Sequence, residues 1–168
     1  MRIVSMRSSQ IGIGMIEVLI AVLVLAVGAL GFAGVQLVAM QKSEDANYRS
    51  AAMLIAQDAV ERIQANSAKI DDYRRSGAIA TPANAPSQTC GAGCDVSGLD
   101  LSQLAWSASQ TLPNGQIKID DCDFNGLTCV VLNWGERDGA ANSIDACTSA
   151  DGVNLAEGSN CLVMEFIR

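Results

Sequence analysis

The sequence contains no histidine, and aromatic residues make up only 4% of its 168 positions. Without histidine the chain cannot have an imidazole base, a serine–histidine–aspartate triad or a Cys₂His₂ zinc site. Basic residues are also few, since 11 Lys and Arg stand against 18 Asp and Glu, giving a net charge of −7. Because an acidic chain repels phosphate backbones, we expect no direct binding of nucleic acid through a broad basic face.

Hydrophobic residues, by contrast, make up 49% of the chain, and the excess lies near the N-terminus, between Ile13 and Met40. Val18–Met40 is a run of 23 residues without a charge. A helix needs about 20 apolar residues to cross the hydrocarbon core of a membrane, so this run is long enough. A cleaved secretory signal is the alternative, but its apolar core would be shorter, about 7–15 residues, and a small-residue cleavage site would follow closely. Arg2 and Arg7 precede the run, which predicts a cytoplasmic start and an exported C-terminal domain.

One acidic residue, Glu17, stands at the start of this apolar run. A charged carboxylate inside a membrane costs about 2.5–3.5 kcal/mol, so it is a candidate functional residue. It could also lie at the headgroup boundary and stabilise the N-terminus of the helix. The stretch GIGMIEVLIA at residues 12–21 resembles the class III signal of type IV prepilins, which has a short basic leader, a glycine and a glutamate five positions after it.

This resemblance implies specific processing. Residues 1–12 would be a leader that a prepilin peptidase removes after Gly12, and Ile13 would become the methylated N-terminus. In the family, the carboxylate corresponding to Glu17 is thought to pair with the N-terminal amine of a neighbouring subunit during assembly. Opposite charges attract strongly in a medium of low dielectric, so such a pair would set the register between subunits.

Helical periodicity continues beyond the apolar run. Apolar side chains recur at steps of three and four at Tyr48, Ala52, Ile55, Ala59 and Ile63, and Asp58 and Arg62 form a favourable i,i+4 pair. We therefore expect one helix from about residue 14 to about residue 66, with a transmembrane and assembly part at 13–40 and an amphipathic part at 41–66. The stretch AMLIAQDAVERIQAN at 52–66 resembles the same region of minor pilins of the PilV type.

The remaining chain predicts a small sheet that packs on this helix. Residues 67–115 should form the connection, with short helices near Lys69–Arg75 and Leu99–Leu112. Residues 116–168 should form an antiparallel sheet of three or four strands with a disulfide-closed C-terminal loop. Strands are expected at 116–121, 129–134 and 160–167, and Asn125-Gly126 favours a tight hairpin turn. The expected fold class is α+β, as in type IV pilins.

All six cysteines lie in the C-terminal half, which the predicted topology places in an oxidising compartment. Six cysteines allow fifteen pairings, of which we expect the one that joins nearest neighbours. It would give Cys90–Cys94, Cys122–Cys129 and Cys147–Cys161, the last closing a loop as the D-loop of pilins does. A zinc site is the alternative, but the chain has neither a CxxC pair nor a histidine.

Two further patterns could suggest other roles. The acidic run at 120–125 lacks the glycine and terminal glutamate of an EF-hand calcium loop, so we interpret it as a solvated hairpin. Trp134 and Arg137 fall where PilV-type proteins often have a W-x-x-R run. Since large aromatic residues mainly serve packing, we expect Trp134 in the core or at a sheet edge.

Nothing in the sequence predicts an enzyme, a metal site or a cofactor. The resemblance implies a minor pilin that helps to initiate or cap a type IV pilus, with roles in biogenesis, twitching motility, adhesion and DNA uptake. Its implied partners are other minor pilins, the major pilin, the prepilin peptidase and inner-membrane lipid. It would first cross the inner membrane once, with its head in the periplasm, and then enter the pilus fibre. Alternatives are a minor pseudopilin of a type II secretion system and a membrane-anchored periplasmic enzyme, which would need a polar site in the C-terminal domain.

Overall fold

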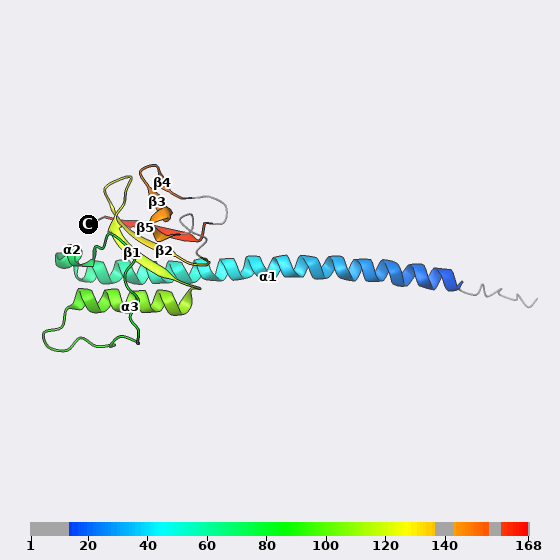
Figure 1. Ribbon diagram of the computed structural model, residues 1–168, viewed down its shortest axis with the longest axis horizontal. Coiled ribbons are helices and arrows are strands. Elements are labelled where there is room, and N and C mark those ends of the chain that lie inside the picture. Colours follow the sequence, from blue (N-terminus) through cyan, green and yellow to red (C-terminus); the bar gives the residue numbers. More distant parts are fainter. Residues whose placement is uncertain (1–13, 137–142, 155–158, 168) are drawn as a thin grey trace, which may run out of the picture. The chain divides into compact units, whose positions relative to one another are not determined.

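The computed structural model describes residues 14–136, 143–154 and 159–167. The chain divides into two compact units, one ending at Glu44 and the other beginning at Asp45. Helix α1 (Met15–Ala65) begins in the first unit and ends in the second (Figure 1). The single long helix expected from the periodicity is therefore confirmed, to within one residue at either end.

The part of α1 in the first unit is apolar and exposed. Every residue from Met15 to Glu44 is solvent-exposed, including Leu25, Leu30 and Phe32. The most apolar 18-residue stretch of the helix has a mean hydropathy of 2.8, and none of it is buried. By length and composition, this helix can cross a membrane.

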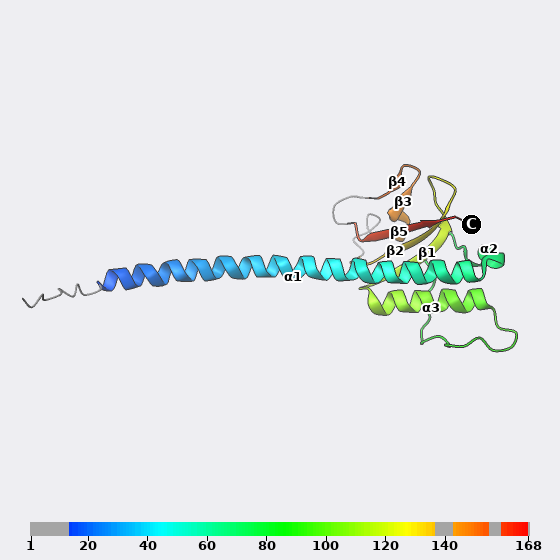
Figure 2. The same ribbon diagram turned by 180° about the vertical axis from the view of Figure 1, so that it is seen from behind.

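The second unit forms its core on one stripe of α1. The buried residues of this stripe recur at steps of three and four, and three of the five are alanine: Ala52, Ile55, Ala56, Ala59 and Ile63. Helix α3 (Val96–Thr111) lies beside this part of α1 in both views (Figures 1 and 2). It contributes Leu101, Leu104, Ala105 and Ala108 to the same core. The helix predicted at Leu99–Leu112 is thus present and begins three residues earlier.

A three-stranded antiparallel sheet covers the other side of this core. It consists of β1 (Gln116–Asp121), β2 (Thr128–Asn133) and β5 (Cys161–Phe166), in the order β1-β2-β5. In the register, Val131 of β2 lies opposite Lys118 of β1 and Val163 of β5. Alternate side chains face the helices, including Ile117, Ile119, Val130, Leu132 and Phe166. This arrangement confirms the expected α+β fold, a long N-terminal helix packed on a small antiparallel sheet.

The opposite face of the sheet is covered as well. A short 3₁₀ helix, η3 (Ile144–Cys147), and the small ladder of β3 (Thr148–Ser149) and β4 (Gly152–Val153) follow β2. Ile144 packs with Val131 and three cysteines in a second hydrophobic cluster. Because both of its faces are covered, all six residues of β2 are buried.

Two segments on either side of β1 complete the sheet: the loop to β2 and the chain that follows α2. A six-residue loop, 122–127, joins β1 to β2, so the expected tight turn forms only the tip, where Gly126 has a φ of 73°. At the other edge of β1, the chain that follows α2 (Ile70–Tyr73) runs alongside the strand. There the backbone N–H groups of Arg75 and Ile79 donate to the carbonyl oxygens of Ile119 and Ile117 at 2.7 and 2.8 Å. These bonds cover an edge that could otherwise pair with another chain.

Candidate assembly site and the head that supports it

Glu17, the acidic residue of the apolar segment, lies in the first turn of α1. Its backbone N–H donates to the carbonyl oxygen of Gly14 at 2.9 Å, and its side chain is exposed. Around it on the helix surface are apolar residues, including Val18, Ala21 and Leu25. Within the described parts of the chain the structure shows no ion pair for its carboxylate. The expected processing residues Gly12 and Ile13 lie outside the described residues.

In the second unit, which we call the head, a set of polar side chains holds α1, α2 and α3 together. We call this set the Arg62 cluster. Arg62 Nε donates to Asp58 Oδ1 at 2.9 Å, and its Nη1 donates to Asp100 Oδ1 at 3.0 Å. The same Nη1 reaches Gln103 Oε1 at 2.6 Å. One guanidinium on α1 thus binds two side chains of α3, which fixes the position of that helix along α1.

Tyr73 extends the cluster to α2. Its hydroxyl donates to Asp100 Oδ2 at 2.6 Å and accepts a hydrogen bond from Asn66 Nδ2 at 3.2 Å. The side chain is fully buried, and burial raises the pKa of Tyr73 to about 12, with the Asp100 carboxylate adding to the effect. The hydrogen bond with Asp58 and that with Asp100 likewise raise the pKa of Arg62.

The Asp58–Arg62 pair that the sequence indicated is present, but it is one part of a larger set. Sequence reasoning missed Tyr73, Asp100 and Gln103, which lie up to 41 residues from their partner in the chain. Asp58, Arg62 and Asn66 are conspicuous in the stretch that resembles PilV-type pilins, and all three belong to the cluster. That stretch of α1 therefore carries the polar side chains that bind α2 and α3.

The six cysteines form Cys90–Cys94, Cys122–Cys129 and Cys147–Cys161, which is the nearest-neighbour pairing proposed from the sequence. The last two lie on the sheet face that η3 covers, where Cys122, Cys129 and Cys147 are buried. Cys122–Cys129 joins the first residue of the β1–β2 loop to β2, and Cys147–Cys161 joins η3 to β5. Both bonds therefore hold the second hydrophobic cluster together.

Trp134 is a core residue, as expected, with 2% of its surface exposed. The guanidinium of Arg49 on α1 lies 5.7 Å from the centre of its ring, in a cation–π contact. Its neighbour in the expected W-x-x-R run, Arg137, lies outside the described residues.

The acidic run at 120–125 is used for contacts within the head. Asp121 forms an ion pair with Arg74, Asp123 accepts a hydrogen bond from Thr148 Oγ1 at 2.8 Å, and Asn125 Nδ2 donates to Glu165 at 2.7 Å. No cluster of acidic or cysteine side chains suited to a metal ion occurs among the described residues.

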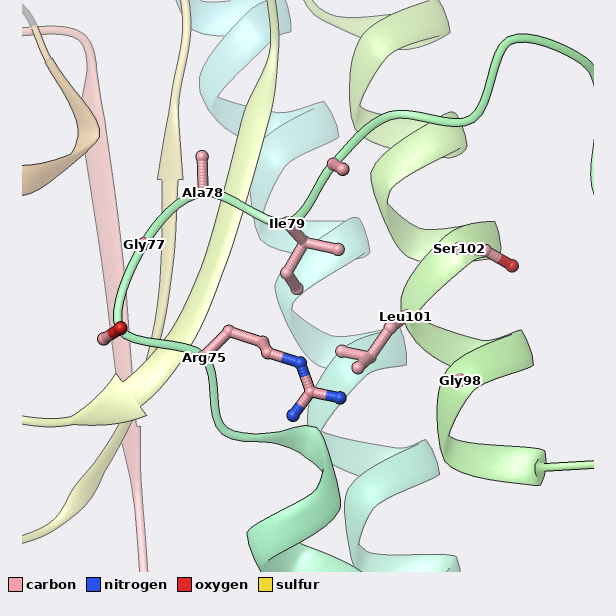
Figure 3. A pocket seen from close by; sticks show the side chains of 9 residues that line it. Arg75, Gly77, Ala78, Ile79, Gly98, Leu101 and Ser102 are labelled. Atoms are coloured by element: carbon pink, nitrogen blue, oxygen red, sulfur yellow. The ribbon is translucent and has the colours of Figure 1, made fainter.

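One open pocket, of about 500 Å³, lies between the chain at 75–80 and α3. Figure 3 shows Arg75 and Leu101 extending toward each other across it, while the Ser102 hydroxyl points away. Arg75 Nη1 donates to the carbonyl oxygen of Arg74 at 2.7 Å. Of the nine residues in the lining, Arg75 alone is charged, so the lining itself supplies no acid–base pair for catalysis.

Comparison with known families gives one match. Residues 34–104 match the model of a family described as Tt1218-like, type IV pilin Tt1218. The match supports a type IV pilin. It runs from the apolar part of α1 through the Arg62 cluster and covers less than half of the chain. No curated protein and no solved structure matches.

Type IV pilins are in general structural, non-enzymatic proteins, so the match supports a structural role. The exposed apolar helix is consistent with anchoring in a membrane and with assembly alongside other pilins.

Proposed function

We propose that this chain is a minor pilin, of the PilV type, that helps to initiate or cap a type IV pilus. In this role it supports pilus biogenesis, twitching motility, adhesion and DNA uptake. The observation that carries the proposal is α1, whose first part is apolar and exposed on all sides while its last part is the core helix of the head. So large an exposed apolar surface needs a covering, because soluble monomers rarely expose apolar patches above about 600 Å².

Two coverings suit the exposed part of α1 in succession. Before assembly it crosses the inner membrane, where hydrocarbon surrounds it and the head lies in the periplasm. After assembly the corresponding helices of other minor pilins and of the major pilin take the place of the lipid. No charge interrupts Val18–Met40, so within this run the exchange of lipid for helices moves no charge through hydrocarbon.

Glu17 would determine how neighbouring subunits align during this exchange. We propose that the prepilin peptidase cuts after Gly12, which frees and methylates the amine of Ile13. The Glu17 carboxylate then pairs with the amine of a neighbouring subunit. Each charge offsets the cost of burying the other, so the pair forms only where both arrive at the same depth.

A deletion of the gene tests the function as a whole. We expect the loss or marked reduction of surface pili and of twitching, scored by electron microscopy and motility on agar, with normal secretion of exported enzymes. Loss of secretion with normal piliation would instead identify a minor pseudopilin of a type II secretion system.

A Glu17→Ala substitution tests the assembly step. We expect normal membrane insertion, because the change removes a charge from an apolar segment, but reduced recovery of the protein in sheared pili. Glu17→Gln should behave in the same way, since it keeps the shape and loses the charge. Glu44→Ala is the matched control, being an exposed acidic residue of the same helix beyond the apolar run. Wild-type recovery of both Glu17 variants would refute the role of this carboxylate.

Processing has a direct readout. Mass spectrometry of the mature N-terminus should find methylated Ile13. Any other first residue would contradict cleavage after Gly12.

A further inference from the structure

The three disulfides of the head lie in very different surroundings. Cys122–Cys129 and Cys147–Cys161 belong to the second hydrophobic cluster, where Val131 and Ile144 pack against them. The Cys90–Cys94 bond belongs to neither hydrophobic cluster of the head, and both of its cysteines are exposed. An external thiol can therefore approach this bond from solvent without any movement of the core.

The loop that Cys90–Cys94 closes is short and equally exposed. Only Gly91, Ala92 and Gly93 lie between the two cysteines, and all three are exposed. The backbone N–H of Cys94 donates to the carbonyl oxygen of Gly91 at 3.1 Å, and Gly93 has a φ of 81°. A backbone turn thus holds the loop together independently of the bond between the sulfur atoms.

Little of the fold depends on this bond. It closes a loop with a sequence separation of 4, whereas the loops of the other two have separations of 7 and 14. The stabilisation that a disulfide provides by restricting the unfolded chain decreases as its loop shortens. Opening Cys90–Cys94 therefore removes the smallest restriction and exposes no hydrophobic side chain of either cluster.

We propose that Cys90–Cys94 is a thiol–disulfide exchange site whose partner is an accessible dithiol. One thiolate of the dithiol attacks Sγ of Cys90 or Cys94, forms a mixed disulfide and releases the other cysteine as a thiolate, which takes up a proton. The second thiol of the partner then loses its proton and attacks the mixed disulfide. The cysteine pair leaves reduced, and the partner leaves with a disulfide of its own. Two electrons pass from the dithiol to the pilin, and no other reactant is needed.

The test is a titration of the full-length protein, purified in detergent, with dithiothreitol as the dithiol. Free thiols are blocked with iodoacetamide at each concentration and located by peptide mass spectrometry. We expect the loss of one disulfide first, with alkylation at Cys90 and Cys94, while the other four cysteines remain paired and the far-UV circular dichroism remains unchanged. If either of the other pairs opens first, or all three open together, the proposal is wrong.

A second experiment detects the intermediate. After incubation with reduced glutathione and an acid quench, the wild-type protein should carry a glutathione adduct on Cys90 or Cys94. The matched control replaces both of these cysteines with serine. We expect it to keep the far-UV spectrum of the wild-type protein and to form no adduct. Adducts on the buried cysteines, or loss of the folded spectrum in this control, would overturn the proposal.

Discussion

Replacing Tyr73 with phenylalanine removes one hydroxyl group from the Arg62 cluster and leaves the aromatic ring in place. The hydroxyl donates to the Asp100 carboxylate at 2.6 Å and accepts from Asn66 at 3.2 Å. Asp100 itself is only 16% exposed, so water replaces the missing donor poorly. The substitution therefore tests how much the polar contacts between the helices contribute to the stability of the head.

The hydrogen bond gives the size of the effect at neutral pH. A hydrogen bond to a charged group contributes about 1.5–3 kcal/mol to the free energy of unfolding. Separately, burial raises the pKa of Tyr73 from its ordinary value of 10.0 to about 12. At about 1.36 kcal/mol per pKa unit, this corresponds to a preference for the neutral phenol of roughly 2.7 kcal/mol in the folded state. At pH 7 the phenol is neutral in both states, so the hydrogen bond sets the effect, and we expect Tyr73→Phe to lower the free energy of unfolding by about 1.5–3 kcal/mol. The pKa shift acts only at higher pH.

The same shift determines the pH dependence. Because the folded protein holds the proton more tightly than the unfolded chain, this stability is complete below pH 10 and decreases as the pH rises toward 12. By pH 11 about 1.4 kcal/mol of it should be lost. The difference between the wild-type protein and Tyr73→Phe should therefore shrink over this range, because the variant has no phenol to ionise at this position.

The assay is urea unfolding of the full-length protein in detergent, followed by tryptophan fluorescence, because Trp134 is buried in the head. Tyr48→Phe is the matched control. That tyrosine packs partly buried against the same core, but no hydrogen bond to its hydroxyl occurs in the described parts of the chain. A loss below about 0.5 kcal/mol for Tyr73→Phe, or an equal loss in the two variants, would refute the reasoning, since surface changes alone stay within that range.

Three further substitutions test contacts within the head. Arg62→Ala removes the shared donor of the cluster and should lower the free energy of unfolding by about 2–3 kcal/mol, a figure reduced because the arginine side chain is 30% exposed. Arg62→Lys should lose only part of this stability, and equal losses for the two variants in urea unfolding would argue against a role for the shape of the guanidinium. Gly115→Ala places a Cβ against the backbone carbonyl of Ala108 and should cost about 1–3 kcal/mol, measured as a lower thermal midpoint; an unchanged midpoint would contradict the close approach. Replacing Cys147 and Cys161 with serine opens a loop with a separation of 14 residues and should cost about 3 kcal/mol; wild-type stability would show that the bond restricts little.

Much of the fold was predictable because its signals are local. The alternation of apolar and polar side chains along Gln116–Asp121 and the spacing of Ala52, Ile55 and Ala59 each reflect the geometry of one element. They predicted the long helix, the helix before the sheet, and the three main strands. The pairing of neighbouring cysteines follows the same logic, because short loops bring their ends together easily.

The second layer on the sheet was harder to foresee. The run Cys129–Leu132 is apolar at four successive positions, which is typical of a strand covered on both faces. In the sequence, however, nothing near Ile144 indicates a helix that would cover the second face. That covering depends on the disulfide between Cys147 and Cys161 and on packing against Val131, which are contacts between distant parts of the chain.

By itself, the sequence determined the apolar segment, its one acidic residue and the periodicity of the elements, because these depend on residue order within a few turns. Only the tertiary structure decided what Arg62 binds, since Asp100 and Gln103 reach it from another helix. It also separated one exposed disulfide from two that lie against the core. Burial depends on which surfaces meet, and that is a property of the folded chain rather than of any stretch within it.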